Sequence, residues 1–450
     1  MSKPIETLEN QLAQWAMVLA LLISGAESQA APSNFPRPDF PAADGPILAL
    51  VETNQVIYVG GLFTHIGGKA RRNLAAVDSM TGIVTEWNPD PDQSVHALVS
   101  YGGAIFVGGR FSSIGGLSRP GVAAVDLRTG QATSWTTTIE DRTIEGYIAS
   151  VNVLTVFAET LYVGGQAIKV GGVSLLGAVD IVNGTPHSSW QPNILGSAPS
   201  IDALAISSNA VYVGGRFTEV AFQPRTYLAA LDPGTGAPLR WDPSPNALVS
   251  DLGLSTNVLY VGGRFTSIGG QTRNGLAAVD TAGTVSSWNP SSTNSNVIRA
   301  LSLSGSRVYV AGSFQSIGGQ SRTNLAAIDA ITGQATAWRP SETDQINALV
   351  VSAETVYVGG LLDNFFGIVS PYFAVFPPKG WSVLSQPHLV SGNFSFRLLG
   401  EEGSNYVIQA TATLTNWSSV FTNTVSNGGF DYSEPATNTS PRFYRAVSGQ

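Results

Sequence analysis

The side chains best suited to chemistry in this 450-residue chain lie on one insertion and two shorter irregular segments. The insertion, TTTIEDRTIEGYIAS, follows Trp135 and combines carboxylates, an arginine and a tyrosine. Such groups on one face can bind a sugar or a peptide, and a surface insertion without a ligand is the alternative. The predicted ligand-binding residues are Glu140, Asp141, Arg142, Glu145 and Tyr147 in the insertion, Asp363 and Asn364 in the second segment, and Arg225 and Tyr227 in the third.

No motif of a catalytic or cofactor site accompanies these residues. The sequence contains no Gly-x-Ser-x-Gly elbow, no P-loop and no Gly-x-Gly-x-x-Gly that opens a helix. Cysteine is absent, which excludes a disulfide scaffold, a thiolate zinc site and a cysteine nucleophile. The four histidines lack the paired spacing of metal ligands: His65, His96, His187 and His388. We therefore predict a chain that is not an enzyme and holds no metal and no cofactor.

The composition favours a β-structure rich in turns and disfavours a nucleic-acid partner. Only 12% of the residues are charged, against about 25% in ordinary globular domains. The chain has 49 glycines and 25 prolines, which mark turns. Its net charge of −8 opposes binding to a phosphate backbone.

A repeated segment supplies the elements that must position the candidate residues. Tyr58-Val59-Gly60-Gly61 recurs, with small changes, at 106–109, 162–165, 212–215, 260–263, 309–312 and 357–360. In each repeat a short apolar segment precedes this run, and in the first six a loop, a Leu-Ala-Ala-Val-Asp-like segment and a segment ending in tryptophan follow it. Such short β-branched and aromatic runs between turn residues are typical of strands. Four strands in each of seven repeats of about 50 residues predict a seven-bladed β-propeller.

The seventh repeat is incomplete at its end. Its third strand can be 372–376, but Pro377-Pro378 stops the chain before a fourth strand with a tryptophan. Phe40 lies ten residues before Leu50, much as Trp87 lies eleven residues before Leu98. We therefore expect residues 33–40 to supply the missing outer strand and to close the ring, which otherwise leaves an exposed edge.

Residues that recur in every repeat are predicted to be structural, because a catalytic acid or nucleophile must be unique. The tryptophans are expected to pack between blades, and the Asp-x-x-Thr-Gly segments to form turns. Loop arginines are expected to bind backbone carbonyls or an aspartate. The tryptophans are Trp87, Trp135, Trp190, Trp241, Trp288 and Trp338, and the arginines are Arg72, Arg110, Arg216, Arg264, Arg273 and Arg322.

The two ends of the chain differ from the repeats. Residues 15–24, WAMVLALLIS, are too few to span a bilayer and precede the small-x-small site Ser28-Gln29-Ala30. This pattern predicts a signal peptide over 1–30, with a buried N-terminal helix as the alternative, and no later segment is typical of a membrane span. Residues 379–450 alternate in short apolar runs, which predicts a small β-sandwich.

Three resemblances to known families follow from these residues. NVLYVGGRFTSIGGQTRNGLAAVDTAGTVSSWNP, 257–290, resembles the delta-60 repeat of bacterial secreted proteins and the ectodomains of fungal cortical polarity markers. YVIQATATLTNW followed by RFYRA resembles a C-terminal module of secreted verrucomicrobial and planctomycete proteins. Ala76-Val77-Asp78 with Thr81-Gly82 and Trp87 is similar to the tryptophan-docking motif of quinoproteins. The first resemblance implies a propeller without catalysis, and the third implies a quinone-dependent dehydrogenase.

Together these features predict an all-β protein with a propeller over 31–378 and a sandwich over 379–450. We expect it to be secreted or held in the cell envelope, monomeric, and to bind a protein or polysaccharide ligand without catalysis. The alternative is an exported propeller enzyme, either a quinone-dependent dehydrogenase or a carbohydrate-active enzyme.

Overall fold

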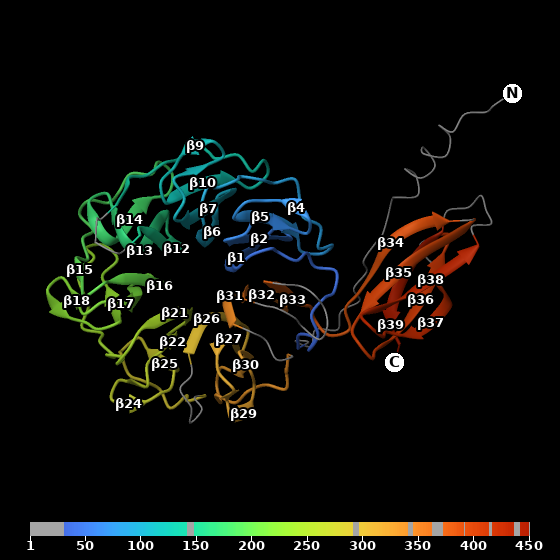
Figure 1. Ribbon diagram of the computed structural model, residues 1–450. Coiled ribbons are helices and arrows are strands. Elements are labelled where there is room, and N and C mark those ends of the chain that lie inside the picture. The colour runs from blue at the N-terminus through green and yellow to red at the C-terminus, as the bar shows by residue number, and fades with distance from the viewer. Residues whose placement is uncertain are drawn as a thin grey trace. The chain divides into compact units, whose positions relative to one another are not determined.

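The computed structural model describes residues 31–141, 148–290, 297–340, 345–361, 372–390, 392–413, 416–435 and 442–449. The chain divides into two compact bodies. The larger body is Asp39–Val375, and the smaller body combines the chain up to Pro38 with the chain from Phe376 onward. All regular elements of the described residues are β-strands, so the all-β class is confirmed (Figure 1).

Each of the seven repeats in the larger body forms one antiparallel three-stranded sheet, with the middle strand carrying the aromatic-Val-Gly-Gly run. A pair between Gln166 and Ser200 joins the third and fourth sheets. In chain order the sheets are β1(Ile47–Thr53), β2(Val56–Gly61), β5(Leu74–Asp78); β6(Val95–Tyr101), β7(Ala104–Gly109), β10(Val122–Asp126); β12(Ser150–Phe157), β13(Thr160–Val170), β14(Val173–Asp180); β16(Ser200–Ile206), β17(Val211–Arg216), β20(Leu228–Leu231); β21(Val249–Ser255), β22(Val258–Gly263), β25(Leu276–Asp280); β26(Val297–Ser304), β27(Arg307–Ser313), β30(Leu325–Asp329); and β31(Gln345–Ser352), β32(Thr355–Leu361), β33(Phe373–Phe376).

The loop between the second and third strands folds into a short hairpin in most repeats. An arginine after the hairpin binds a backbone carbonyl further along the chain, as Arg273 binds Ser286 O at 2.7 Å and Arg322 binds Thr336 O at 2.8 Å. The predicted structural role of these two arginines is confirmed. The hairpins are β3(His65–Ile66)–β4(Lys69–Ala70), β8(Ser113–Ile114)–β9(Leu117–Ser118), β18(Glu219–Val220)–β19(Gln223–Pro224), β23(Ser267–Ile268)–β24(Gln271–Thr272) and β28(Ser316–Ile317)–β29(Gln320–Ser321).

The expected fourth strand is reduced to one β-bridge in each of the first six repeats. Val84, for example, bridges Val77 and no ladder continues beyond it. The hydroxyl of Thr85 accepts the backbone N–H of Trp87 at 3.3 Å. Because this turn takes up the N–H that a ladder would need, the chain leaves the sheet at the tryptophan.

Two adjacent glycines let the sheets approach one another closely. A methyl group on Gly60 would lie less than 3 Å from the side chain of Val95 in the next repeat. A methyl group on Gly61 would lie equally close to the backbone that precedes β1 in its own sheet. The same two contacts recur at Gly108-Gly109 and in later repeats. The glycine pair therefore sets the spacing of the innermost strands.

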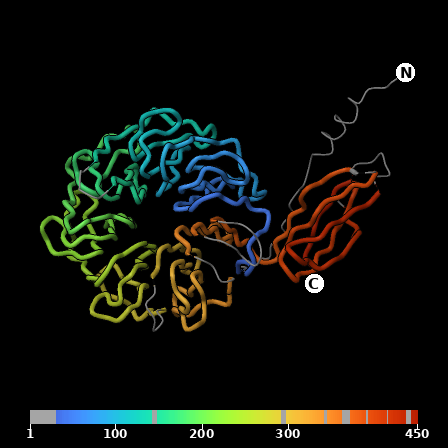
Figure 2. The backbone as a smooth tube through the Cα atoms, in the orientation of Figure 1, coloured from blue at the N-terminus to red at the C-terminus, as the bar shows by residue number. Residues whose placement is uncertain are grey.

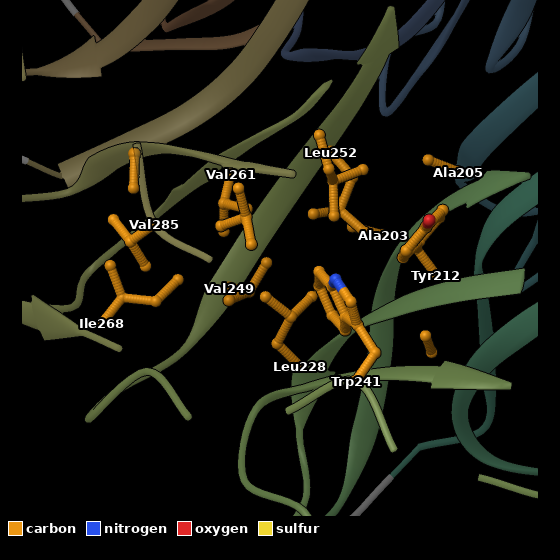
Figure 3. Packing of buried hydrophobic residues seen from close by; sticks show 14 of the residues in the cluster. Ala203, Ala205, Tyr212, Leu228, Trp241, Val249, Leu252, Val261, Ile268 and Val285 are labelled. Carbon is orange, nitrogen blue, oxygen red and sulfur yellow. The ribbon is translucent and has the colours of Figure 1, made fainter. Parts of the chain in front are cut away.

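The tryptophans fill the space between neighbouring sheets farther out, as predicted. All six are at most 8% exposed, and each packs edge-on against the aromatic residue of its own repeat at 5.0–5.6 Å between ring centres. Trp241 Nε1 also donates to the carbonyl of Asp280 in the following repeat at 2.9 Å. Figure 3 shows this interface, where Leu228 and Trp241 lie beside Val249 of β21.

The first strands of successive repeats lie side by side, and β31 lies beside β1, so the repeats form a ring (Figure 2). No sheet pairing joins β31 to β1 among the described residues. Side chains hold this junction: a methyl group on Gly359 would meet Ile47, and Ser352 Oγ donates to Glu52 Oε2 at 2.7 Å.

Phe40 takes the place of the missing seventh tryptophan. It is buried and packs edge-on against Tyr357 and Phe373, with ring centres 6.5 and 5.8 Å apart. The expected outer strand over 33–40 does not form. The chain contains Pro36, Pro38 and Pro41 here, and proline cannot donate to a ladder.

The smaller body contains two antiparallel three-stranded sheets. Their buried residues form one cluster that includes Phe396, Tyr406, Phe430 and Tyr432. In this body Ser33 N donates to Pro377 O at 2.6 Å. The sheets are β34(Ser382–Val390), β35(Asn393–Gly400), β38(Gly429–Pro435) and β37(Ser418–Thr424), β36(Asn405–Thr411), β39(Phe443–Ser448).

Across the described ranges, no helical segment has both the length and the apolar character that crossing a bilayer requires. The predicted signal peptide, residues 1–30, lies outside these ranges.

Replacing Phe40 with alanine is expected to weaken the junction between the last and first repeats. Removing a buried phenylalanine lowers the free energy of unfolding by about 3–5 kcal/mol. Urea unfolding of the variant should therefore have a lower midpoint than that of the unaltered protein. Phe222→Ala is the matched control, because Phe222 is 77% exposed and its removal should change the midpoint little. Equal midpoints for Phe40→Ala and Phe222→Ala would show that Phe40 does not hold the ring together.

Candidate functional site

Every first strand of the ring begins with a β-bulge. In repeat two Val95 pairs with Gly109 and Ala97 with Gly108, which leaves His96 without a partner in the ladder. A bulge redirects the side chain of the extra residue. We call the seven extra residues the bulge residues: Leu48, His96, Asn152, Asp202, Ser250, Arg299 and Asn347.

The bulge residues line the inner edge of the ring, where the first strands adjoin one another, and all seven are half-buried. Hydrogen bonds connect them from one repeat to the next. Asn152 Nδ2 donates to Asp202 Oδ1 at 3.0 Å. Arg299 Nη2 donates to Gln345 Oε1 at 3.2 Å, and Gln345 Nε2 donates to Asn347 Oδ1 at 3.0 Å. Six of the seven are polar and their types differ, unlike the residues that build the repeats.

His96 is held neutral at this edge. Its Nε2 and Nδ1 each lie 2.9 Å from a serine hydroxyl, of Ser94 and Ser150 respectively. Burial lowers the pKa of His96 to about 4, and the positive charge of Arg110 acts in the same direction. At neutral pH the imidazole therefore offers one donor and one acceptor rather than a charge.

Two carboxyl groups at the inner edge have raised pKa values. Burial raises the pKa of Asp202, although Ser200, Asn152 and Arg216 each favour its charged form. Burial also raises the pKa of Asp251 to about 7, against two backbone N–H groups that it accepts. These donors are Leu252 N at 2.8 Å and, across the interface, Leu301 N at 2.6 Å. The other repeats have alanine or valine at the position of Asp251.

A second set of residues surrounds the bulge residues at the same end of the sheets. Each of these residues directly follows the glycine pair of its repeat. Each also lies next to the start of the first strand: in repeat two, for example, Arg110 N donates to Ser94 O at 2.9 Å. We call these the rim residues: Leu62, Arg110, Gln166, Arg216, Arg264, Ser313 and Leu361.

The three rim arginines differ from the expectation that loop arginines bind backbone carbonyls. The guanidinium groups of Arg110, Arg216 and Arg264 are exposed, and none has a hydrogen bond or ion pair with the residues that the structure describes. Their charges act on the bulge residues instead: Arg216 favours ionised Asp202, and Arg264 contributes to the lowered pKa of Arg299, which burial mainly causes. The other arginine in that prediction, Arg72, pairs with Asp90 at 2.7 Å.

The residues predicted from the insertion lie in repeat three. Glu140 and Asp141 belong to β11(Ile139–Asp141), which pairs with the end of β13. Both side chains are exposed, and Glu140 stands opposite Lys169. The remaining predicted residues of the insertion and of the seventh repeat are outside the described ranges: Arg142, Glu145, Tyr147, Asp363 and Asn364.

Arg225 and Tyr227 lie in repeat four, next to the hairpin of β18 and β19. Arg225 donates to Pro224 O at 2.7 Å and Leu239 O at 3.0 Å, the bonds that Arg273 and Arg322 make in their repeats. Tyr227 packs against the core between repeats four and five. No hydrogen bond or ion pair connects these two residues with Glu140 or Asp141 among the described residues.

Sequence reasoning missed the bulge residues because they lie inside segments that read as apolar. Val95-His96-Ala97-Leu98 and Ile346-Asn347-Ala348-Leu349 each contain one polar residue in an otherwise apolar run. The available signal was the alignment of the repeats, in which this position changes from leucine to histidine, asparagine, aspartate, serine and arginine.

The inner edge thus holds a neutral imidazole, amides, arginines and carboxyl groups of raised pKa. The described residues contain no group of three or more His, Asp or Glu side chains that could hold a metal ion. The arrangement is suited to hydrogen bonding and to attracting negative charge.

The comparisons with known proteins agree with a β-propeller. A family described as a β-propeller domain of unknown function, DUF5122, matches residues 254–285, which contain β22 to β25. A chain of the mitotic checkpoint complex is 16% identical, with a TM-score of 0.50 over 80% of this chain and 99% of its own.

Two further structures are less similar. The β-propeller domain of Myceliophteria thermophila Cps50 (Swd1) is 10% identical, with a TM-score of 0.48 over 75% of this chain and 98% of its own. The designed protein Ika8 is 15% identical, with a TM-score of 0.48 over 77% and 100%. No curated protein matches the sequence significantly. These matches do not support the resemblances to fungal polarity markers or to the verrucomicrobial module.

Asp251 is expected to make the stability of the protein depend on pH. The carboxyl group has a pKa of about 7 in the folded protein and an ordinary value of 3.8. Between these values the folded state binds more protons than the unfolded chain, so the free energy of unfolding falls as pH rises. A shift of this size corresponds to a loss of up to about 4 kcal/mol.

Urea unfolding of the Asp251→Ala variant, measured from pH 4 to pH 8, should lack this decline. Alanine occupies the same position in most other repeats, so the variant restores the residue of the repeat. Asp141→Ala, at an exposed carboxylate, should keep the decline. Parallel pH profiles for the unaltered protein and Asp251→Ala would contradict the raised pKa.

Proposed function

We propose that this protein is an exported seven-bladed β-propeller with a C-terminal β-sandwich, and that it binds a ligand without catalysing a reaction. The propeller fold supports a binding or interaction role. The apolar run and small-x-small site in residues 1–30 support export. We therefore propose that the protein is secreted or held in the cell envelope, and further that it is a monomer.

The ligand site that we propose is the inner edge of the ring, formed by the bulge and rim residues. The supporting observation is that these two positions vary between repeats while the glycines, tryptophans and turn aspartates recur. Positions that the ring does not constrain are free to adapt to a ligand. The exposed insertion at Glu140 and Asp141 can contribute further contacts.

Thermal denaturation of the mature chain, 31–450, tests this proposal with a panel of peptides, polysaccharides, peptidoglycan fragments, and calcium with pyrroloquinoline quinone. A ligand at about 100 times its dissociation constant stabilises the protein by about 2.7 kcal/mol. We expect one peptide or glycan to raise the melting temperature, and Arg299→Gln to reduce the increase.

The control is Arg128→Gln, which removes an exposed arginine in the turn after β10, at the other end of its sheet from Arg110. This variant should keep the full increase. A shift with calcium and the quinone, accompanied by alcohol or sugar oxidation, would make the protein an enzyme. A panel without any shift, or shifts that Arg299→Gln leaves unchanged, would contradict the proposed site.

A further inference from the structure

The rim and bulge residues include an apolar group and a basic group, which we call the apolar part and the basic part of the rim. The apolar part lies at the junction of the last and first repeats, where β31 and β32 adjoin β1. Leu62 and Leu361 are exposed there, at 57% and 44%, and Leu48 is the bulge residue beside them. No other rim or bulge position is occupied by an apolar residue. These leucines are exposed at equivalent positions of adjacent repeats, where a ligand could cover them.

The basic part occupies repeats two, four, five and six. It contains Arg110, Arg216 and Arg264 at the rim and Arg299 among the bulge residues. The three rim guanidinium groups are exposed and have no hydrogen-bond or ion-pair partner among the described residues. Asp202 is the one carboxyl group at either position. This concentration of positive charge contrasts with the net charge of −8 of the whole chain.

We propose that the inner edge binds a polypeptide segment that carries acidic side chains together with an aliphatic one. The carboxylates would pair with the rim arginines, whose planar guanidinium groups can form bidentate hydrogen bonds with a carboxylate. The aliphatic side chain would cover Leu62 and Leu361. This inference rests on the proposed function and specifies the partner for that site.

The residue types at the site favour a peptide over an acidic glycan. Binding of a sugar ring commonly uses the face of a tryptophan, tyrosine or phenylalanine, and none of these occupies the fourteen rim and bulge positions. A glycan also has no aliphatic side chain to place on the leucines. The charge complementarity alone would suit either ligand, so the apolar part of the rim decides between them.

Fluorescence anisotropy with labelled short peptides tests this inference. We expect a peptide of alternating glutamate and leucine to bind, and peptides of alternating glutamate and serine or glutamine and leucine to bind about tenfold more weakly. Raising the salt concentration should weaken binding, because exposed charges are screened. The double variant Arg216→Gln/Arg264→Gln should weaken it about tenfold, and so should Leu62→Ser.

Matched controls lie outside the rim and bulge positions. Arg128→Gln/Arg240→Gln changes the net charge equally, and Ile83→Ser removes an aliphatic side chain that is 62% exposed. Both controls should bind the peptide as the unaltered protein does.

Polygalacturonate separates failure of this inference from failure of the proposed function. If polygalacturonate binds, depends on Arg216 and Arg264, and the glutamate–leucine peptide does not bind, the partner is an acidic glycan and the inference is wrong. In that case the proposed site still stands. If peptide binding is equal in the rim variants and the controls, both the inference and the proposed site are wrong.

Discussion

The contact between a glycine pair and the next repeat is the constraint on which the larger body depends. At Gly60, Gly108 and the equivalent glycines, no side chain separates the middle strand from the β-branched residue of the following first strand, and repeat six has Ala311 at this position. Farther out, a tryptophan fills the same interface. Each interface is therefore narrow near the first strands and wide near the third. Because every interface is wider on the same side, each sheet is rotated in the same direction relative to the one before it. Successive sheets therefore form a ring.

The last and first repeats of the ring are joined by the same kind of aromatic packing, but the residue that supplies it precedes the first repeat. Phe40 contacts Tyr357 and Phe373, as a tryptophan contacts the aromatic residue of its repeat in the other six. Ser352 and Glu52, 300 residues apart in sequence, share a hydrogen bond at this junction. The chain thereby avoids an unpaired face of its last sheet without forming a hydrogen-bonded strand there.

Two positions in each repeat take no part in these contacts of the glycines and tryptophans. The bulge residue lies outside the ladder, and the rim residue projects beyond the glycine pair. Neither position takes part in the glycine and tryptophan contacts between sheets, so its residue type can range from leucine to arginine in one chain. Burial at the inner edge then alters the chemistry of what is placed there, as the neutral His96 and the raised pKa of Asp251 show.

The sequence by itself determined the repeat, its strands and the structural role of the residues that recur, because spacing and residue type carry that information. Phe40 could be matched to the tryptophans for the same reason. Only the tertiary structure decided three further features. The fourth strand ends after one bridge in each of the first six repeats. The bulge shifts the alternation of side chains, so His96, Asp202 and Arg299 all lie at the inner edge although their segments read as apolar. The protonation of Asp251 depends on burial against a neighbouring repeat, and burial of that kind exists only once distant parts of the chain have been brought together.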